Sequence, residues 1–155
     1  MGLDMYLSAE KFIGGYSFME EKEKETYHSI VNAIEAEGLA GKDSPTGTVS
    51  LNVGYWRKQN AIHNWFVNNV QGGVDECDKH SVSRESLESL RRLCLEVLKD
   101  NSKAMKLLPP TAGFFFGGTE IDEYYIEGLK YTVEMITKAL DRADESWTFY
   151  YQSSW

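Results

Sequence analysis

The segment richest in groups that could bind a ligand spans residues 55–66 and reads YWRKQNAIHNWF. If the segment is helical, Trp56, Asn60 and His63 share one face, because residues three and four apart are neighbours on a helix. An indole, an amide and an imidazole can stack on a nucleobase and hydrogen-bond to it, while adjacent cations neutralise a phosphate. We therefore predict a pocket wall built from Trp56, Arg57, Lys58, Asn60, His63 and Asn64.

The same residues also fit a purely structural interpretation. Trp56 and Trp65 would then belong to the hydrophobic core, and His63 and the amides would be hydrogen-bonded polar groups at the edge of that core. The structural interpretation is the preferred one for this segment, and the ligand-binding interpretation stays open beside it.

A run of three phenylalanines lies between glycines and could supply a second wall. Glycine permits tight bends and the close approach of a ligand. In an extended chain the first and third rings face one way and the second faces the other, so we expect one face to be core and the other to stack on ligand. The predicted residues are Phe114, Phe115 and Phe116.

Catalytic and metal-binding patterns are weak. His63 could act as a general base, but no Gly-x-Ser-x-Gly, His-Glu-x-x-His or Walker pattern provides partners for it. Cys77 and His80 form one pair of candidate zinc ligands, whereas a structural zinc site usually needs two such pairs. We expect an exposed turn there, no metal or cofactor, and a protein that is more readily explained as a non-enzyme.

Composition restricts the class of partner. The chain has 155 residues, 16 basic and 24 acidic side chains and a formal net charge of −8, so it repels the phosphate backbone of duplex nucleic acid. Two cysteines in a chain of this size favour a reducing compartment. Because no basic leader and no apolar run of about 20 residues is present, we expect no membrane partner and a cytoplasmic location.

The hydrophobic periodicity predicts an α+β fold. Period-two alternation indicates strands at 3–7, 49–53 and 147–151. Helical spacing indicates four helices: one that begins with the charged run 20–25 and ends at Gly38, one over 55–70, one capped by Ser83, and one capped by Thr119 that runs to Leu140. We expect a single domain, 1–155, with a small antiparallel sheet and about four helices mainly on one face. The aromatic C-terminus, 147–155, suggests homo-oligomerisation.

Three blocks of the sequence resemble small proteins encoded by tailed bacteriophages and prophages. They are residues 1–7, MGLDMYL, residues 55–67, YWRKQNAIHNWFV, and residues 107–117, LLPPTAGFFFG. The resemblance implies a phage accessory protein in a bacterial cytoplasm, and it transfers no catalytic residue.

By analogy with small phage proteins that counter host defence, the leading hypothesis is a non-enzymatic sponge for a nucleotide-derived immune signal. The alternative is a protein-binding inhibitor or structural accessory factor that acts on a host or phage protein. A hydrolase centred on His63 is the third hypothesis.

Overall fold

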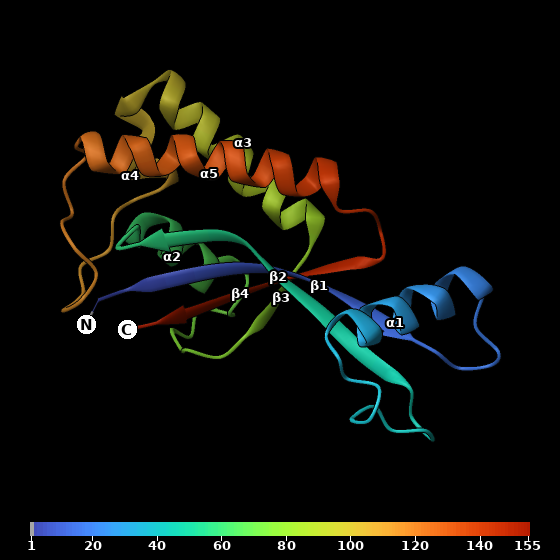
Figure 1. Ribbon diagram of the computed structural model, residues 1–155. Coiled ribbons are helices and arrows are strands. Elements are labelled where there is room, and N and C mark those ends of the chain that lie inside the picture. The colour runs from blue at the N-terminus through green and yellow to red at the C-terminus, as the bar shows by residue number, and fades with distance from the viewer. Residues whose placement is uncertain (1) are drawn as a thin grey trace. The chain divides into compact units, whose positions relative to one another are not determined.

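The computed structural model describes residues 2–155, which form an α+β fold (Figure 1). The strands are β1 (Asp4–Gly14), β2 (Thr46–Arg57), β3 (His80–Val82) and β4 (Trp147–Ser154). The helices are α1 (Glu21–Ala33), α2 (Asn60–Asn69), α3 (Arg84–Lys99), α4 (Ala104–Leu107) and α5 (Glu123–Arg142), with a 3-10 helix, η1 (Asn101–Lys103). The four strands form one antiparallel sheet in the order β2-β1-β4-β3, which confirms the predicted fold class.

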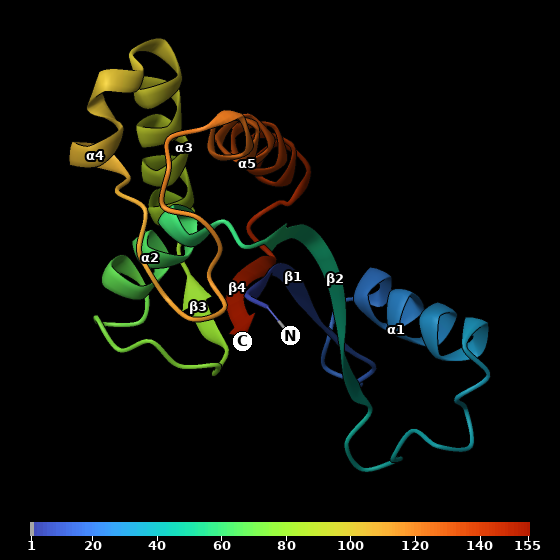
Figure 2. The ribbon, with the colours of Figure 1, turned by 90° about the vertical axis from the view of Figure 1, so that its left-hand side faces the viewer.

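The described chain divides into two compact units. The larger unit comprises residues 2–9 and 52–155, and the smaller unit comprises Glu10–Leu51. In the larger unit α2, α3 and α5 lie on the same side of the strands in two perpendicular views (Figures 1 and 2). The smaller unit contains α1, residues 10–14 of β1 and residues 46–51 of β2.

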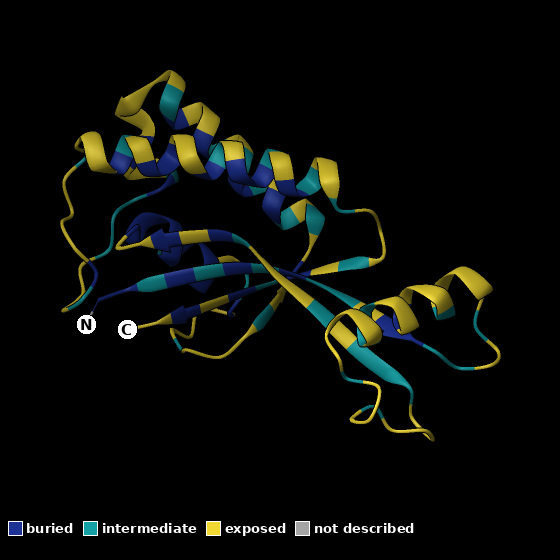
Figure 3. Ribbon diagram, in the orientation of Figure 1, coloured by how far each residue is buried: buried dark blue, intermediate teal, exposed yellow. Residues whose placement is uncertain are grey.

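The core of the larger unit follows the alternation that the sequence predicts. Leu3, Met5 and Leu7 of β1 are fully buried, and Phe149 and Tyr151 of β4 are buried in the same way. The inward faces of α3 and α5 are also buried, while their outward faces are exposed (Figure 3). Apolar burial of this kind is the main driving force for the fold.

The starts of the two long helices are set by different caps. Ser83 caps α3 as predicted, because its Oγ accepts a hydrogen bond from the Ser86 N–H at 3.0 Å. The predicted cap of the last helix, Thr119, is wrong. Asp122 is the N-cap of α5, and its carboxylate accepts from the Tyr125 N–H at 2.9 Å. An Asp cap accepts from a backbone N–H of the first turn that has no partner within the helix, and its negative charge complements the helix dipole.

The predicted helix over 55–70 is only partly correct. Tyr55, Trp56 and Arg57 continue strand β2, and α2 begins at Asn60. The strand extends this far because β1 remains alongside, with the Lys58 N–H donating to the Leu3 carbonyl at 2.8 Å. Tertiary pairing thus overrides the helical spacing of the side chains. Trp56 therefore does not share a helix face with the residues of α2.

The end of α1 also differs from the prediction. The expected stop at Gly38 is wrong, because the helix ends at Ala33 and Glu35 has a φ of 55°. The Ala36 N–H donates to the Val31 carbonyl at 2.9 Å and the Glu35 N–H donates to the Asn32 carbonyl at 3.0 Å. These two bonds are those of a Schellman motif, here with Glu rather than Gly at the left-handed position.

Among residues 2–155, no helix combines the length and the apolar character that crossing a bilayer requires.

Candidate ligand-binding site

The Trp56 side chain belongs to the core of the larger unit. Only 2% of the residue is exposed, and its indole N–H donates to the Thr132 Oγ1 at 2.8 Å. The ring also contacts Phe66 edge-on, with 5.9 Å between the ring centroids. Because its ring is buried and its polar atom has a protein partner, Trp56 supports the fold and does not form a ligand wall in this structure.

His63 is buried and both of its ring nitrogens are engaged. Nδ1 lies 2.7 Å from the Tyr151 hydroxyl, and Nε2 lies 3.0 Å from an Asp75 carboxylate oxygen. A carboxylate can only accept, so Nε2 carries a hydrogen and donates to Asp75. In the neutral imidazole Nδ1 then accepts from the Tyr151 hydroxyl, whose pKa burial raises well above its ordinary value. Only 1% of His63 is exposed, so in this structure a substrate from solvent does not reach its imidazole.

Asp75 also connects His63 to the C-terminus. The same Asp75 oxygen accepts a hydrogen bond from the Trp155 indole N–H at 3.2 Å. Asp75 carries no recognisable signal in the sequence, since it lies in an aperiodic stretch between Gly73 and β3. No local pattern could have paired it with His63 or Trp155, because these partners lie 12 and 80 positions away in the chain.

Asn60 fixes the loop that carries the three phenylalanines. Its Nδ2 donates to the carbonyls of Phe116 at 3.0 Å and Gly118 at 2.8 Å. Its Oδ1 accepts from the Thr111 N–H at 3.0 Å. Since the residue is buried and all these partners are backbone groups, Asn60 positions the loop between residues 111 and 118.

The three phenylalanines have three different environments. Phe116 is buried, with its ring edge-on to His63 at 5.1 Å between centroids. Phe115 is half-buried, and Phe114 is 96% exposed. The expectation that Phe114 and Phe116 face the same way is wrong, because the Phe116 N–H donates to the Gly113 carbonyl and closes a turn. Only Phe114 and part of Phe115 face solvent.

Arg57 and Lys58 are exposed cations beside this loop. A Cβ placed on Gly117 would lie 3.1 Å from the Lys58 Cβ, so the lysine stem packs directly on the loop backbone. Leu3 connects the two segments, because its carbonyl accepts from the Lys58 N–H and its own N–H donates to the Phe115 carbonyl at 3.1 Å. The start of β1, the C-terminus and the loop lie at the same end of the larger unit (Figures 1 and 2).

We refer to these exposed groups as the sheet-end surface, which consists of Arg57, Lys58, Phe114, Phe115 and Trp155. Four of the nine predicted site residues belong to it. The cavity beside Lys58 is only about 30 Å³, which is enough for a water-sized group. A larger ligand would therefore lie on the open surface rather than in a preformed pocket.

Asn64 lies in a different place. It lines a cavity of about 130 Å³ between the outer side of α2 and Leu107–Pro109. Its Oδ1 accepts from the Asn68 Nδ2 at 3.0 Å, so its amide already has a partner within the helix. The structure does not bring Asn64 to the sheet-end surface.

No family model matches the chain, and no curated protein or solved structure shows a significant similarity to it. Within residues 2–155, no group of three or more His, Cys, Asp or Glu side chains is arranged to hold a metal ion. His80 instead contacts the Glu76 carboxylate at 2.9 Å. The geometry of the sheet-end surface is thus the basis for the functional proposal.

Proposed function

We propose that this protein binds a small phosphorylated, nucleotide-like ligand on the sheet-end surface without transforming it. The observation that carries the proposal is the exposure of Phe114, at 96%, on a loop that Asn60 holds with three hydrogen bonds. An aromatic ring offers a stacking face to any base. Because the loop is already ordered, binding costs little of the entropy that a mobile loop would lose.

The cations beside the loop supply the second half of the recognition. Arg57 and Lys58 can make charge-assisted hydrogen bonds to phosphate oxygens. A net charge of −8 opposes binding to a polymer of phosphates, but two local cations suffice for one or two phosphates. A mononucleotide or a short oligonucleotide is therefore the ligand that best fits two local cations on a chain of net negative charge.

The buried members of the predicted site act as supports in this proposal. Asn60 orders the loop, and His63 contacts Phe116 and is linked through Asp75 to Trp155. Since the imidazole of His63 is buried away from solvent, the geometry supports a binding protein better than a hydrolase.

The sequence blocks that resemble phage proteins supply the biological setting. We place the ligand among nucleotide-derived signals of bacterial immunity, which a phage protein would sequester in the cytoplasm of its host. A protein that acts by sequestration needs binding and slow release but no turnover, and this matches a surface that offers stacking and cationic groups.

The proposal is tested by releasing ligand from protein purified from cells with an active nucleotide signalling system. Heat-denatured protein should release an ultraviolet-absorbing molecule that mass spectrometry identifies as an unmodified nucleotide. The same molecule should raise the melting temperature of the protein. We expect Phe114→Ala to weaken binding about tenfold or more, since stacking contributes about 1–3 kcal/mol per base.

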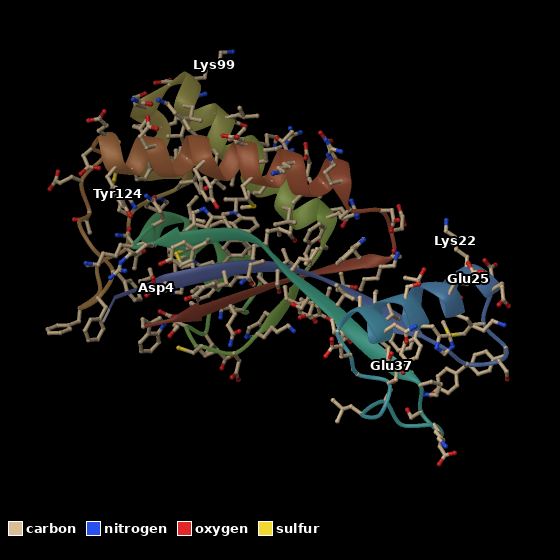
Figure 4. The ribbon with its side chains drawn as sticks, in the orientation of Figure 1. Asp4, Lys22, Glu25, Glu37, Lys99 and Tyr124 are labelled. Atoms are coloured by element: carbon tan, nitrogen blue, oxygen red, sulfur yellow. The ribbon has the colours of Figure 1, made fainter. Side chains whose placement is uncertain are left out.

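Arg57→Ala should also weaken this binding, and the affinity that remains should depend less on the salt concentration than that of the wild type. Lys99→Ala is the matched control, because Lys99 is an exposed cation at the C-terminal end of α3 (Figure 4). Release of a chemically altered product would contradict the binding role, and equal affinity in the Phe114→Ala protein would exclude the sheet-end surface.

A further inference from the structure

The two edges of the sheet differ greatly in length. β3 forms one edge and has 3 residues, whereas β2 forms the other edge and has 12. An edge strand presents unpaired backbone N–H and C=O groups on its outer side, which another strand can bind. The length of β2 makes its outer side the largest such surface that the sheet offers.

The C-terminal part of β2 is covered by tyrosines of α5. The Tyr131 hydroxyl accepts from the Tyr55 N–H at 3.1 Å, and the Tyr124 hydroxyl donates to the Arg57 carbonyl. Tyr124 is at the start of α5 (Figure 4). In this part of β2 the Tyr55 N–H and the Arg57 C=O are therefore occupied by side chains of the larger unit.

The N-terminal part of β2, Thr46–Leu51, belongs to the smaller unit and pairs with β1 in a register that its own contacts define. The Gly15 N–H donates to the Pro45 carbonyl at 2.8 Å. The same register places Ser50 opposite Glu10, and the Ser50 Oγ donates to the Glu10 carboxylate at 2.9 Å. Two independent contacts thus agree on which residues face each other.

This register determines which backbone groups point outward. Alternate residues of an antiparallel strand direct their N–H and C=O groups to opposite sides. Since Pro45 faces β1, the backbone groups of Thr46, Thr48 and Ser50 face away from it. The Thr46 N–H donates to the Ser44 carbonyl at 2.8 Å, whereas the N–H groups of Thr48 and Ser50 point to the side on which the sheet has no further strand.

The open edge lacks the residues that usually prevent pairing. No charged side chain occurs between Ser44 and Trp56, and no proline occurs within β2. The smaller unit as a whole has eight acidic and four basic residues, a net charge of −4. Thr and Val favour strands, so this segment is an uncharged, strand-forming edge in a strongly charged unit.

We propose that Thr46–Leu51 of β2 pairs antiparallel with the same segment of a second copy of the chain and forms a symmetric dimer. Pairing centred on Thr48 places Thr48 opposite Thr48 of the copy and Thr46 opposite Ser50. Cross-strand pairs of Thr with Thr or Ser are stabilising, and no like charges face each other. A second copy fits this edge better than an acidic or basic partner, because the contact surface itself is neutral and self-complementary.

Apolar side chains beside the edge would add to the buried area. Phe12 lies opposite Thr48 in the register given above and is 58% exposed, and Leu51 is 50% exposed. A pair of strands alone buries less surface than a stable interface requires. Burial of Phe12 and Leu51 in both copies would add part of the interface area that strand pairing alone lacks.

The test measures the mass of the protein by light scattering over a concentration series. The wild type should approach twice the monomer mass of 17.7 kDa as concentration rises. Thr48→Lys should remain monomeric at every concentration, because two lysines would face each other across the symmetry axis. Ser29→Lys is the control, since it adds the same charge to an exposed position of α1 and should dimerise like the wild type.

A charge-swap experiment makes the test specific to this register. Thr48→Glu should also be monomeric alone, whereas an equal mixture of the Thr48→Lys and Thr48→Glu proteins should form mixed dimers. Circular dichroism should show that each variant is folded. A wild type that stays monomeric up to its solubility limit, or a mixture that does not associate, would overturn the proposal, as would a dimer that survives Thr48→Lys.

Discussion

His63 and Tyr151 are hydrogen-bonded in the core at 2.7 Å although 88 residues separate them in the chain. The bond joins α2 to β4, and together with the Asp75 carboxylate at Nε2 it holds the imidazole of His63 in place. Because Tyr151 is fully buried and keeps its proton, the pair is a structural element of the larger unit.

Removal of the Tyr151 hydroxyl should destabilise the fold. In Tyr151→Phe the aromatic packing is kept, but the buried Nδ1 of His63 loses its donor. We expect the free energy of unfolding to fall by about 1–3 kcal/mol, the usual cost of an unsatisfied buried polar atom. Urea denaturation measures this change. Tyr150→Phe is the control, since Tyr150 is only half-buried, and a loss of the same size there would contradict the explanation.

Loss of the Asn60 side chain should release the phenylalanine loop. Asn60→Ala removes three hydrogen bonds to the backbone between residues 111 and 118. We expect a loss of about 3 kcal/mol in stability, at about 1 kcal/mol per bond. Limited chymotrypsin digestion should cut near Phe114 much faster than in the wild type. Asn68→Ala, at an exposed position of α2, should change neither property, and an uncut Asn60→Ala loop would contradict the proposed role.

Replacement of Glu35 should stabilise α1. Glu35 has a φ of 55° and lies at the left-handed position after the helix, where glycine has no steric cost. We expect Glu35→Gly to raise the free energy of unfolding by about 0.5–1 kcal/mol. The comparison is Glu37→Gly, which lies in the following exposed segment without a positive φ and should bring no gain. Thermal denaturation of both variants and the wild type measures the two changes in stability.

The two cysteines should react at very different rates. Cys77 is exposed, whereas burial raises the pKa of the Cys94 thiol to about 12. Because the thiolate is the reactive form, an alkylating reagent at pH 8 should label Cys77 rapidly and Cys94 only after unfolding. Mass spectrometry of the labelled peptides reads out both rates.

The same shift implies a dependence of stability on alkaline pH. The pKa of Cys94 is raised in the folded state, so the protonated thiol contributes to the free energy of unfolding. This contribution is fully present below the pKa of an unfolded cysteine, about 8.5, and is lost as the pH rises towards about 12. Cys94→Ala should remove this component of alkaline destabilisation. An identical pH profile in the variant would show that Cys94 does not ionise in the way proposed.

Much of the architecture follows from local patterns in the sequence. The alternation of Leu3, Met5 and Leu7 predicts β1, and the spacing of Ile126, Leu129 and Ile136 predicts α5; both elements are present. These predictions succeed because the period of apolar residues reflects which face of an element is buried. The Ser83 cap is likewise local, since its acceptor bonds a donor three residues later.

The candidate site could be predicted only in part. Its residue types and its two segments were recognisable, but which side chains face solvent was not. Trp56 is buried because β2 continues through it and directs its indole towards Thr132 of α5. Phe114 is exposed because a turn at Gly113 separates it from Phe116. Neither outcome depends on the residue alone.

The sequence by itself therefore determined the fold class, the main elements and the types of side chain available for recognition, because those depend on local periodicity and composition. Only the tertiary structure decided that His63 pairs with Tyr151 and Asp75, that Asn60 orders a loop, and that Arg57 and Phe114 remain exposed. The physical reason is that hydrogen-bond partners and burial depend on strands and loops that are distant in the chain.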